Sequence, residues 1–132
     1  MNVLKGKISS LKTSGRLTIV TLDVSGILMK SIIIENPDTV SYLKQNNPIQ
    51  VMFKETEVAI GKGAEIAISM ENRIQGIITE IVKGELLCSL ILDTKVGNIK
   101  ATITVESALR LQLQVGKIVT ALVKTTEIML SE

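Results

Sequence analysis

The chain has 132 residues, of which 45% are hydrophobic and 21% charged, and its positive mean hydropathy of +0.38 is typical of a folded globular protein. It contains no histidine, which excludes the imidazole base of Ser/His and Cys/His catalysis and most transition-metal sites. The net charge of +2 and the aromatic content of 2% argue against a nucleic-acid partner, because charge attracts the phosphate backbone and unpaired bases stack on aromatic rings.

The first half of the chain has the pattern of five short β-strands. Runs rich in Val, Ile, Leu and Thr alternate with turn residues such as Gly, Asn and Asp. The one segment without strand character, Asp38–Lys44, follows Pro37 and is predicted to be a short helix, because proline suits the first helical position. The expected strands are Val3–Leu11, Leu17–Leu22, Ile27–Ile34, Ile49–Phe53 and Thr56–Ile60.

The second half repeats this order. A flexible Gly61–Gly63 connector leads into Ala64–Ile68, which alternates like an extended strand. Glu106–Leu111 is predicted to be the short helix of this half. The expected strands are Arg73–Val82, Leu86–Leu92, Asn98–Thr104, Lys117–Val123 and Glu127–Leu130.

Internal duplication explains this similarity. Shifting the sequence by 70 positions aligns Asn2 with Asn72, Gly6 with Gly76 and, near the end of each half, Lys54 with Lys124. Five strands with a helix between the third and fourth is the order of an OB-type barrel. The sequence therefore predicts an all-β fold of two tandem OB-like five-stranded barrels, residues 1–63 and 64–132, each with one short helix.

Each predicted barrel is small, so we expect it to share its core with a neighbour. A domain of about 60 residues buries only about 60% of its unfolded surface. Ile32–Ile34 and Leu90–Leu92 are apolar at successive positions, which indicates that both faces of these strands are covered. This predicts packing between the repeats, between chains, or both, and hence an obligate homo-oligomer.

Short sequence segments also indicate the cellular location and the role of the single cysteine. No apolar run is long enough for a membrane span, and the first residues lack a signal-peptide pattern, so we expect a cytoplasmic protein without membrane contact. The single cysteine, Cys88, lies in an apolar run and is expected to be a small buried hydrophobic residue.

Three segments of the second half carry a family resemblance. They are Ser69–Gly76 (Ser-Met-Glu-Asn-Arg-Ile-Gln-Gly), Glu106-Ser107-Ala108 followed by Leu111 and Gly116, and Val119–Met129. They resemble, in order, the Ser-Ala-Arg-Asn-Gln-Leu-x-Gly, Glu-Ser-Ala…Leu…Gly and Val-Thr-Ala-Leu-Ile-Lys-Ala-Thr-Glu-Val-Met motifs of the Mop domain, a member of the TOBE group of OB-like barrels. A chain of two such repeats resembles a di-Mop molbindin. The resemblance implies a cytoplasmic binder of molybdate or tungstate, for storage, buffering or homeostasis, assembled as a homotrimer or, second, a dimer.

The resemblance also implies a site between subunits. A tetrahedral dianion presents only hydrogen-bond acceptors, so its site needs N–H groups, hydroxyls and one or two cations. No catalytic side chain and no metal ligand are predicted. The oxyanion-binding residues implied are Ser69, Asn72, Arg73, Ser107, Lys124 and Thr125, with Asn2 and Lys54 as first-half counterparts.

Each of these residues also has a structural interpretation. Lys124 suits a solvated strand end, Ser107 suits the cap of the short helix, and Asn72 suits a turn.

The sequence departs from the family motif at several positions. Glu71 replaces the family's arginine, and a carboxylate about 4 Å from the anion opposes binding by about 4 kcal/mol per unit charge at an effective dielectric of about 20. Arg73, two residues further along the same strand face, is expected to neutralise part of this charge. The first half has Asn36-Pro37 in place of Glu-Ser-Ala, and Glu55 follows Lys54. The second-half site is therefore expected to dominate.

Two other functions remain open at this stage. An OB-type module for single-stranded nucleic acid is disfavoured by the scarcity of aromatic residues. A non-binding di-Mop scaffold with an assembly or regulatory role is favoured by Glu71. An enzyme is disfavoured, because carboxylates such as Asp23, Asp93, Glu57 and Glu127 occupy repeat-equivalent positions and are expected to be structural.

Overall fold

Alternating burial along the first half produces its strands. In the computed structural model, which describes residues 1–132, the side chains of β2 alternate between the core and the surface over most of its length, as expected for a sheet with one covered face. The strands of this half are β1 (Asn2–Ser14), β2 (Leu17–Val24), β3 (Ile27–Ile33), β4 (Pro48–Phe53) and β5 (Ala59–Lys62), with the 3₁₀ helix η1 (Glu55–Glu57) between the last two.

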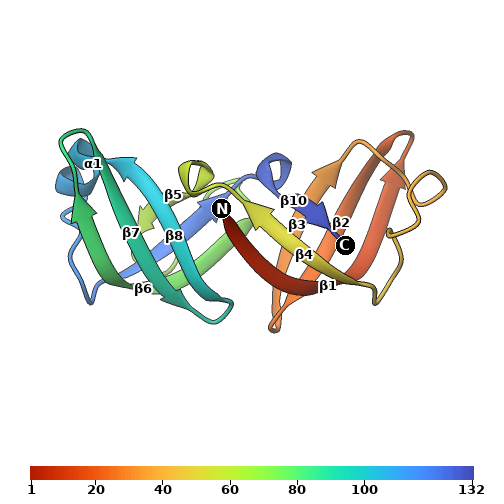
Figure 1. Cartoon of the computed structure of the whole chain (residues 1–132), viewed down its shortest axis with the longest axis horizontal. Coiled ribbons are helices and arrows are strands. Elements are labelled where there is room, and N and C mark those ends of the chain that lie inside the picture. Colours follow the sequence, from red (N-terminus) through yellow and green to blue (C-terminus); the bar gives the residue numbers. More distant parts are fainter.

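The second half follows the same order and adds an α-helix. Its elements are β6 (Asn72–Lys83), β7 (Leu87–Thr94), β8 (Gly97–Thr104), α1 (Val105–Arg110), β9 (Ile118–Val123), η2 (Thr125–Glu127) and β10 (Met129–Ser131). Each half contributes to a strongly curved antiparallel sheet, and the two sheets lie side by side along the long axis (Figure 1). The predicted fold class, tandem five-stranded OB-like units, is confirmed.

The two sheets exchange their last strands. Their strand orders are β10-β4-β1-β2-β3 and β5-β9-β6-β7-β8, so β5 leaves the first half to pair with β9, and β10 returns to pair with β4. Ala59 lies opposite Leu122, and Met129 lies opposite Met52. The sheets therefore differ from the sequence repeats by one strand each, and neither repeat supplies a complete sheet.

A close approach of neighbouring strands explains the glycine shared by the repeats. A Cβ on Gly76 would lie 2.7 Å from Thr94 Cγ2 and 3.0 Å from the Asp93 carbonyl oxygen, and one on Gly6 would lie 2.9 Å from the Asp23 carbonyl oxygen. Glycine is required at both positions because it has no side chain to clash.

Four of the expected elements differ in the structure. The strands predicted at Thr56–Ile60 and Glu127–Leu130 start only at residues 59 and 129, because η1 and η2 occupy the preceding positions. Ala64–Ile68 forms no strand. Asp38–Lys44 forms turns and not a helix. The Asn36 carboxamide oxygen accepts hydrogen bonds from the backbone N–H groups of Asp38 (2.9 Å) and Thr39 (3.2 Å), as at a helix N-terminus, but no helix follows this turn.

The helix predicted at Glu106–Leu111 is confirmed as α1. Its N-cap is Thr104, whose hydroxyl accepts a hydrogen bond from the Ser107 N–H at 3.1 Å. Ser107 therefore lies in the first turn and is not the cap.

One hydrophobic cluster spans both halves. Twenty-five buried residues belong to it, including Val58 and Ile128, which follow η1 and η2 at equivalent positions. Cys88 is fully buried, as expected, and burial raises the pKa of its thiol. No helix is long and apolar enough to span a membrane.

The prediction of two-sided burial holds for one strand only. Leu90 and Leu92 are fully buried and Ile91 partly so, whereas Ile34 is 77% exposed within the single chain. Several other large apolar side chains are more than half exposed, among them Leu86 at 79% and Leu28 at 62%. These side chains are exposed in the single chain.

Candidate functional site

Two asparagines join the halves at the centre of the molecule. The Asn72 carboxamide donates a hydrogen bond to the Lys30 carbonyl (2.9 Å) and accepts one from the Lys30 N–H (2.7 Å). Asn2 makes the same pair of bonds with Lys100, at 2.9 and 2.8 Å. Each side chain thus acts as a piece of β-ladder along the free edge of β3 or β8. Asn72 is fully buried and Asn2 is 5% exposed.

The Lys-Thr-Thr-Glu and Lys-Glu-Thr-Glu segments lie beside these asparagines. Asn72 pairs with Val123 in the sheet, so Lys124 and Thr125 follow directly from the strand that borders Asn72. The turn η2 then packs against β3, and the Ser31 hydroxyl donates a hydrogen bond to the Ile128 carbonyl at 2.9 Å. We call the region of Lys30, Glu71, Asn72, Lys124 and Thr125 the second junction.

The first junction is its counterpart, made of Met1, Asn2, Lys54, Glu55 and Lys100. Asn2 pairs with Phe53, which precedes Lys54, and η1 packs against β8. The duplication therefore places two similar clusters between the sheets, one on each side of the pseudo-symmetric molecule (Figure 1).

The ion pairs of the two junctions are arranged differently. At the second junction, Lys30 Nζ lies 2.9 Å from Glu71 Oε2, and both side chains are about half exposed. At the first, the terminal ammonium of Met1 bonds Glu55. This hydrogen bond is the main cause that holds the pKa of Glu55 below its usual value, with smaller help from its own backbone and from Lys100. The carboxylate of Glu71 is therefore paired with Lys30. The expectation from sequence, that Arg73 neutralises Glu71, is wrong.

The structure brings together only part of the predicted residues. Asn72, Lys124 and Thr125 meet at the second junction, and Asn2 and Lys54 meet at the first. Ser69 is exposed in the connector, three residues before Asn72. Ser107 lies in α1, at the outer end of the molecule and far from both junctions (Figure 1).

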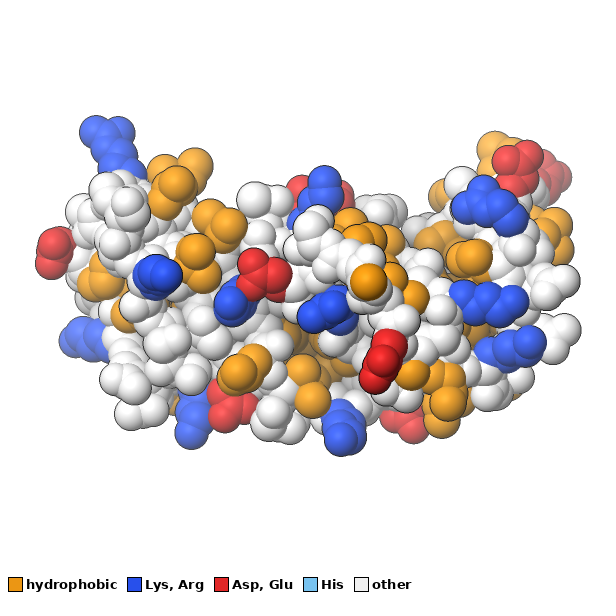
Figure 2. Space-filling view, turned by 180° about the vertical axis from the view of Figure 1, so that it is seen from behind, with side chains coloured by type: hydrophobic (Ala, Val, Ile, Leu, Met, Phe, Trp, Pro, Cys, Tyr) orange, Lys and Arg blue, Asp and Glu red, His pale blue; other side chains and the backbone are white.

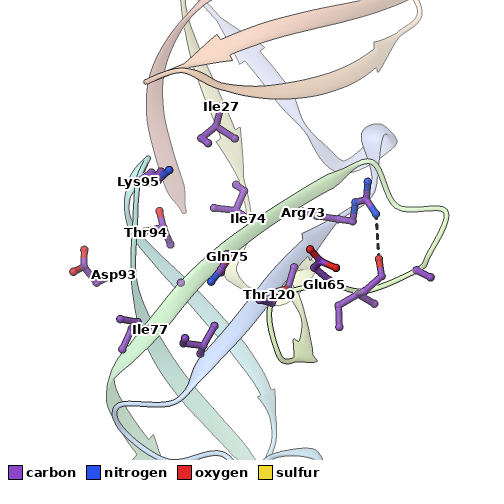
Figure 3. Close-up of a pocket in the computed structure, with 15 residues that line it drawn as sticks. Ile27, Glu65, Arg73, Ile74, Gln75, Ile77, Asp93, Thr94, Lys95 and Thr120 are labelled. Carbon is purple, nitrogen blue, oxygen red and sulfur yellow. Dashed lines mark hydrogen bonds between the residues drawn. The ribbon is translucent and has the colours of Figure 1, made fainter.

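Arg73 lines a different feature, an open groove of about 1180 Å³ beneath the connector. Its Nη1 donates a hydrogen bond to the Ile66 carbonyl at 3.1 Å, which ties the connector to β6 (Figure 3). The Thr120 hydroxyl also holds the connector, by donating a hydrogen bond to the Gly63 carbonyl at 2.8 Å. Acidic and basic groups both line the groove, with Glu65 and Asp93 among them, so it offers no clear preference for an anion.

Sequence reasoning missed Lys30, Lys100 and the terminal ammonium. Lys30 and Lys100 are identical residues 70 positions apart, so the comparison of the repeats contained a signal for them. The comparison of the repeats could not show that Lys30 contacts Asn72 and Lys100 contacts Asn2, because each contact joins residues from different halves.

Each junction combines two lysine ammonium groups with one carboxylate, and the second junction adds the Thr125 hydroxyl. No group of three His, Cys, Asp or Glu side chains is placed to hold a metal ion. On the face shown in Figure 2, basic side chains are dispersed among acidic and apolar ones.

Comparison with known proteins agrees with this architecture. Residues 68–130 match the TOBE domain family. The structure is similar to that of the cytoplasmic molybdate-binding protein ModG with molybdate bound, with a TM-score of 0.89 and 21% identity over 98% of this chain and 94% of ModG. No match was found among curated protein sequences.

Two single-unit proteins are similar to half of the chain. A molybdate-binding protein from Sporomusa ovata is 37% identical over 51% of this chain and all of its own, with a TM-score of 0.49. MopII from Clostridium pasteurianum is 27% identical over 50% of this chain and all of its own, with a TM-score of 0.48. Residues 68–130 therefore belong to the TOBE-domain family, and the whole chain has the two-unit fold of ModG.

Proposed function

We propose that the chain binds a tetrahedral oxyanion, molybdate or tungstate, at the junctions between its two sheets. The observation that carries the proposal is the meeting of two motif segments about 50 residues apart in sequence. Asn72, from the first segment, borders the strand that ends at Lys124, from the second. Lys124 and Thr125 supply ammonium and hydroxyl donors, which bind a dianion, and the buried Asn72 carboxamide holds the backbone of Lys30 beside them. The fold is shared with a protein that has molybdate bound.

The complete site includes a second copy of the chain. Ser107 lies at the outer end of one chain, so it reaches a junction only if another copy brings its α1 there. Exposed apolar side chains such as Ile34 and Leu86 supply surface for such an assembly. We propose a homotrimer, with a dimer as the second choice.

The role that follows is binding without catalysis. Storage, buffering or homeostasis of the oxyanion in the cytoplasm fits a junction that offers ammonium and hydroxyl donors. Tungstate is included because it has the charge and shape of molybdate. Sulfate, a smaller dianion, is expected to bind more weakly.

Calorimetry of the purified protein with molybdate, tungstate and sulfate tests this function. We expect saturable binding of the first two and weaker binding of sulfate. If none of the three gives heat or raises the melting temperature at millimolar concentration, the proposal is wrong. Light scattering tests the assembly, and a well-folded monomer at micromolar concentration would contradict sites shared between subunits.

A non-binding scaffold is the second candidate. Glu71 favours it, because its carboxylate lies at the second junction and already occupies the Lys30 ammonium. The same titration separates the candidates, since a scaffold would assemble normally and bind none of the anions.

A further inference from the structure

We propose that Lys30 is an anion-binding residue of the second junction and that Glu71 is its internal competitor, which leaves the ammonium when the oxyanion binds. The inference rests on the proposed oxyanion function and concerns how the site is completed. It replaces the expectation from sequence that Arg73 is the cation that neutralises Glu71.

The first support is the way the backbone holds Lys30. The backbone N–H of Lys30 donates to the Asn72 carboxamide at 2.7 Å, and its backbone carbonyl accepts from that carboxamide at 2.9 Å. Its neighbours Met29 and Ser31 are buried, whereas the Lys30 side chain is 43% exposed, so the ammonium leaves the strand on the junction side. A fixed backbone lowers the entropy lost when the side chain orders around a ligand.

The second support is proximity to the other donors. Lys30 is joined to Asn72, Asn72 borders Val123, and Lys124 comes next. The following residue, Ser31, is bound to the Ile128 carbonyl at 2.9 Å, just beyond η2. The segment Lys124–Glu127 is thus held against Lys30 at both of its ends, and the two lysines come from different halves of the chain.

The third support is the state of the ammonium itself. It bonds a single carboxylate at 2.9 Å, and that carboxylate is 52% exposed. Exposed ion pairs of this kind are weak, because water competes for both partners. A dianion carrying twice the charge of Glu71 and contacting Lys124 at the same time is therefore able to displace it.

The first junction supplies a matched comparison. Lys100 is held by Asn2 in the same way, at 2.8 and 2.9 Å. There, however, Glu55 stands at the position of Thr125 and is tied to the terminal ammonium of Met1. A carboxylate therefore replaces the hydroxyl donor, and Lys100 is expected to contribute less to anion binding than Lys30.

Calorimetry with molybdate on Lys30→Met, Lys100→Met and Lys12→Met tests the assignment. We expect Lys30→Met to raise the Kd about 10- to 100-fold, as for loss of a charged hydrogen bond. Lys100→Met should raise it less than 5-fold, and Lys12→Met, a surface control of equal charge change, less than 2-fold. Lys30→Arg should bind within 5-fold of the parent, and Glu71→Gln should bind about 3- to 10-fold more tightly.

The outcomes separate the inference from the function. If the parent protein binds molybdate and Lys124→Ala weakens it, but Lys30→Met does not, the inference is overturned and the oxyanion function stands. A parent that binds no molybdate overturns both. Weaker or unchanged binding by Glu71→Gln overturns the competitor role. If Lys30→Met loses the parent's oligomer, Lys30→Gln and Lys30→Arg are compared, and equal affinities of these two variants overturn the role of the charge.

Discussion

Replacement of Asn72 by alanine is expected to loosen the connection between the two halves. The side chain is fully buried and makes two hydrogen bonds to the Lys30 peptide, at 2.7 and 2.9 Å. At about 1 kcal/mol net for each bond, and more if the Lys30 groups stay without partners, Asn72→Ala should lower the free energy of unfolding by about 2 to 4 kcal/mol. Asn2→Ala should cost a similar amount, because Asn2 makes the same two bonds with Lys100.

Urea unfolding followed by circular dichroism measures the effect. Asn98→Ala is the matched control, because Asn98 is an exposed strand residue with no side-chain hydrogen bond to the other half; it should change the free energy by less than about 0.5 kcal/mol. The m-value should stay constant, which indicates that the unfolding transition is unchanged. If Asn72→Ala is no more destabilising than the control, the two hydrogen bonds do not hold the halves together.

Three further predictions concern the junctions and the strand packing. Lys124→Ala should weaken molybdate binding about 10- to 100-fold. Lys54→Ala should weaken it much less, because Glu55 opposes an anion at the first junction. Equal losses of affinity in calorimetry, together with no gain for Glu71→Arg, would show that the site is misplaced. The pKa of Glu55 is lowered in the folded state, so its contribution to stability is present above the unfolded pKa and is lost as the pH falls through the folded pKa. Glu55→Gln should therefore reduce the loss of stability on acidification from about pH 5 to about pH 3, the range in which carboxyl groups titrate. An unchanged dependence of stability on pH would contradict this prediction. Gly76→Ala should destabilise by about 1 to 3 kcal/mol, since its Cβ would lie 2.7 Å from Thr94 Cγ2; a neutral effect in urea unfolding would show that β6 and β7 can separate freely.

Local sequence patterns were sufficient for the strands and for one helix. Period-two burial in β2 and β6 follows directly from the alternation of apolar residues. The segment at Glu106–Leu111 folds as α1, with the Thr104 hydroxyl as its N-cap, whereas Asp38–Lys44 stops at the turn that the Asn36 side chain closes, although its local pattern also resembles a helix start.

The duplication was also readable, because a repeat preserves the residues that meet the same packing demand. Gly6 and Gly76 both face a carbonyl oxygen of the neighbouring strand at a distance that excludes a side chain. The family resemblance came from the same kind of information, since its motifs are contiguous segments in the second half. These features depend on neighbours within a few residues or on the repeat itself.

The tertiary structure alone decided how the halves are joined. Either copy of the last strand has the same pattern whether it completes its own sheet or the other one, so the exchange of β5 and β10 cannot be read from periodicity. Burial of the asparagines and the pairing of Glu71 with Lys30 follow from that exchange. Contacts between residues far apart in sequence are set by the packing of the whole chain. Lys30, the cation beside Glu71, is therefore visible only in the tertiary structure.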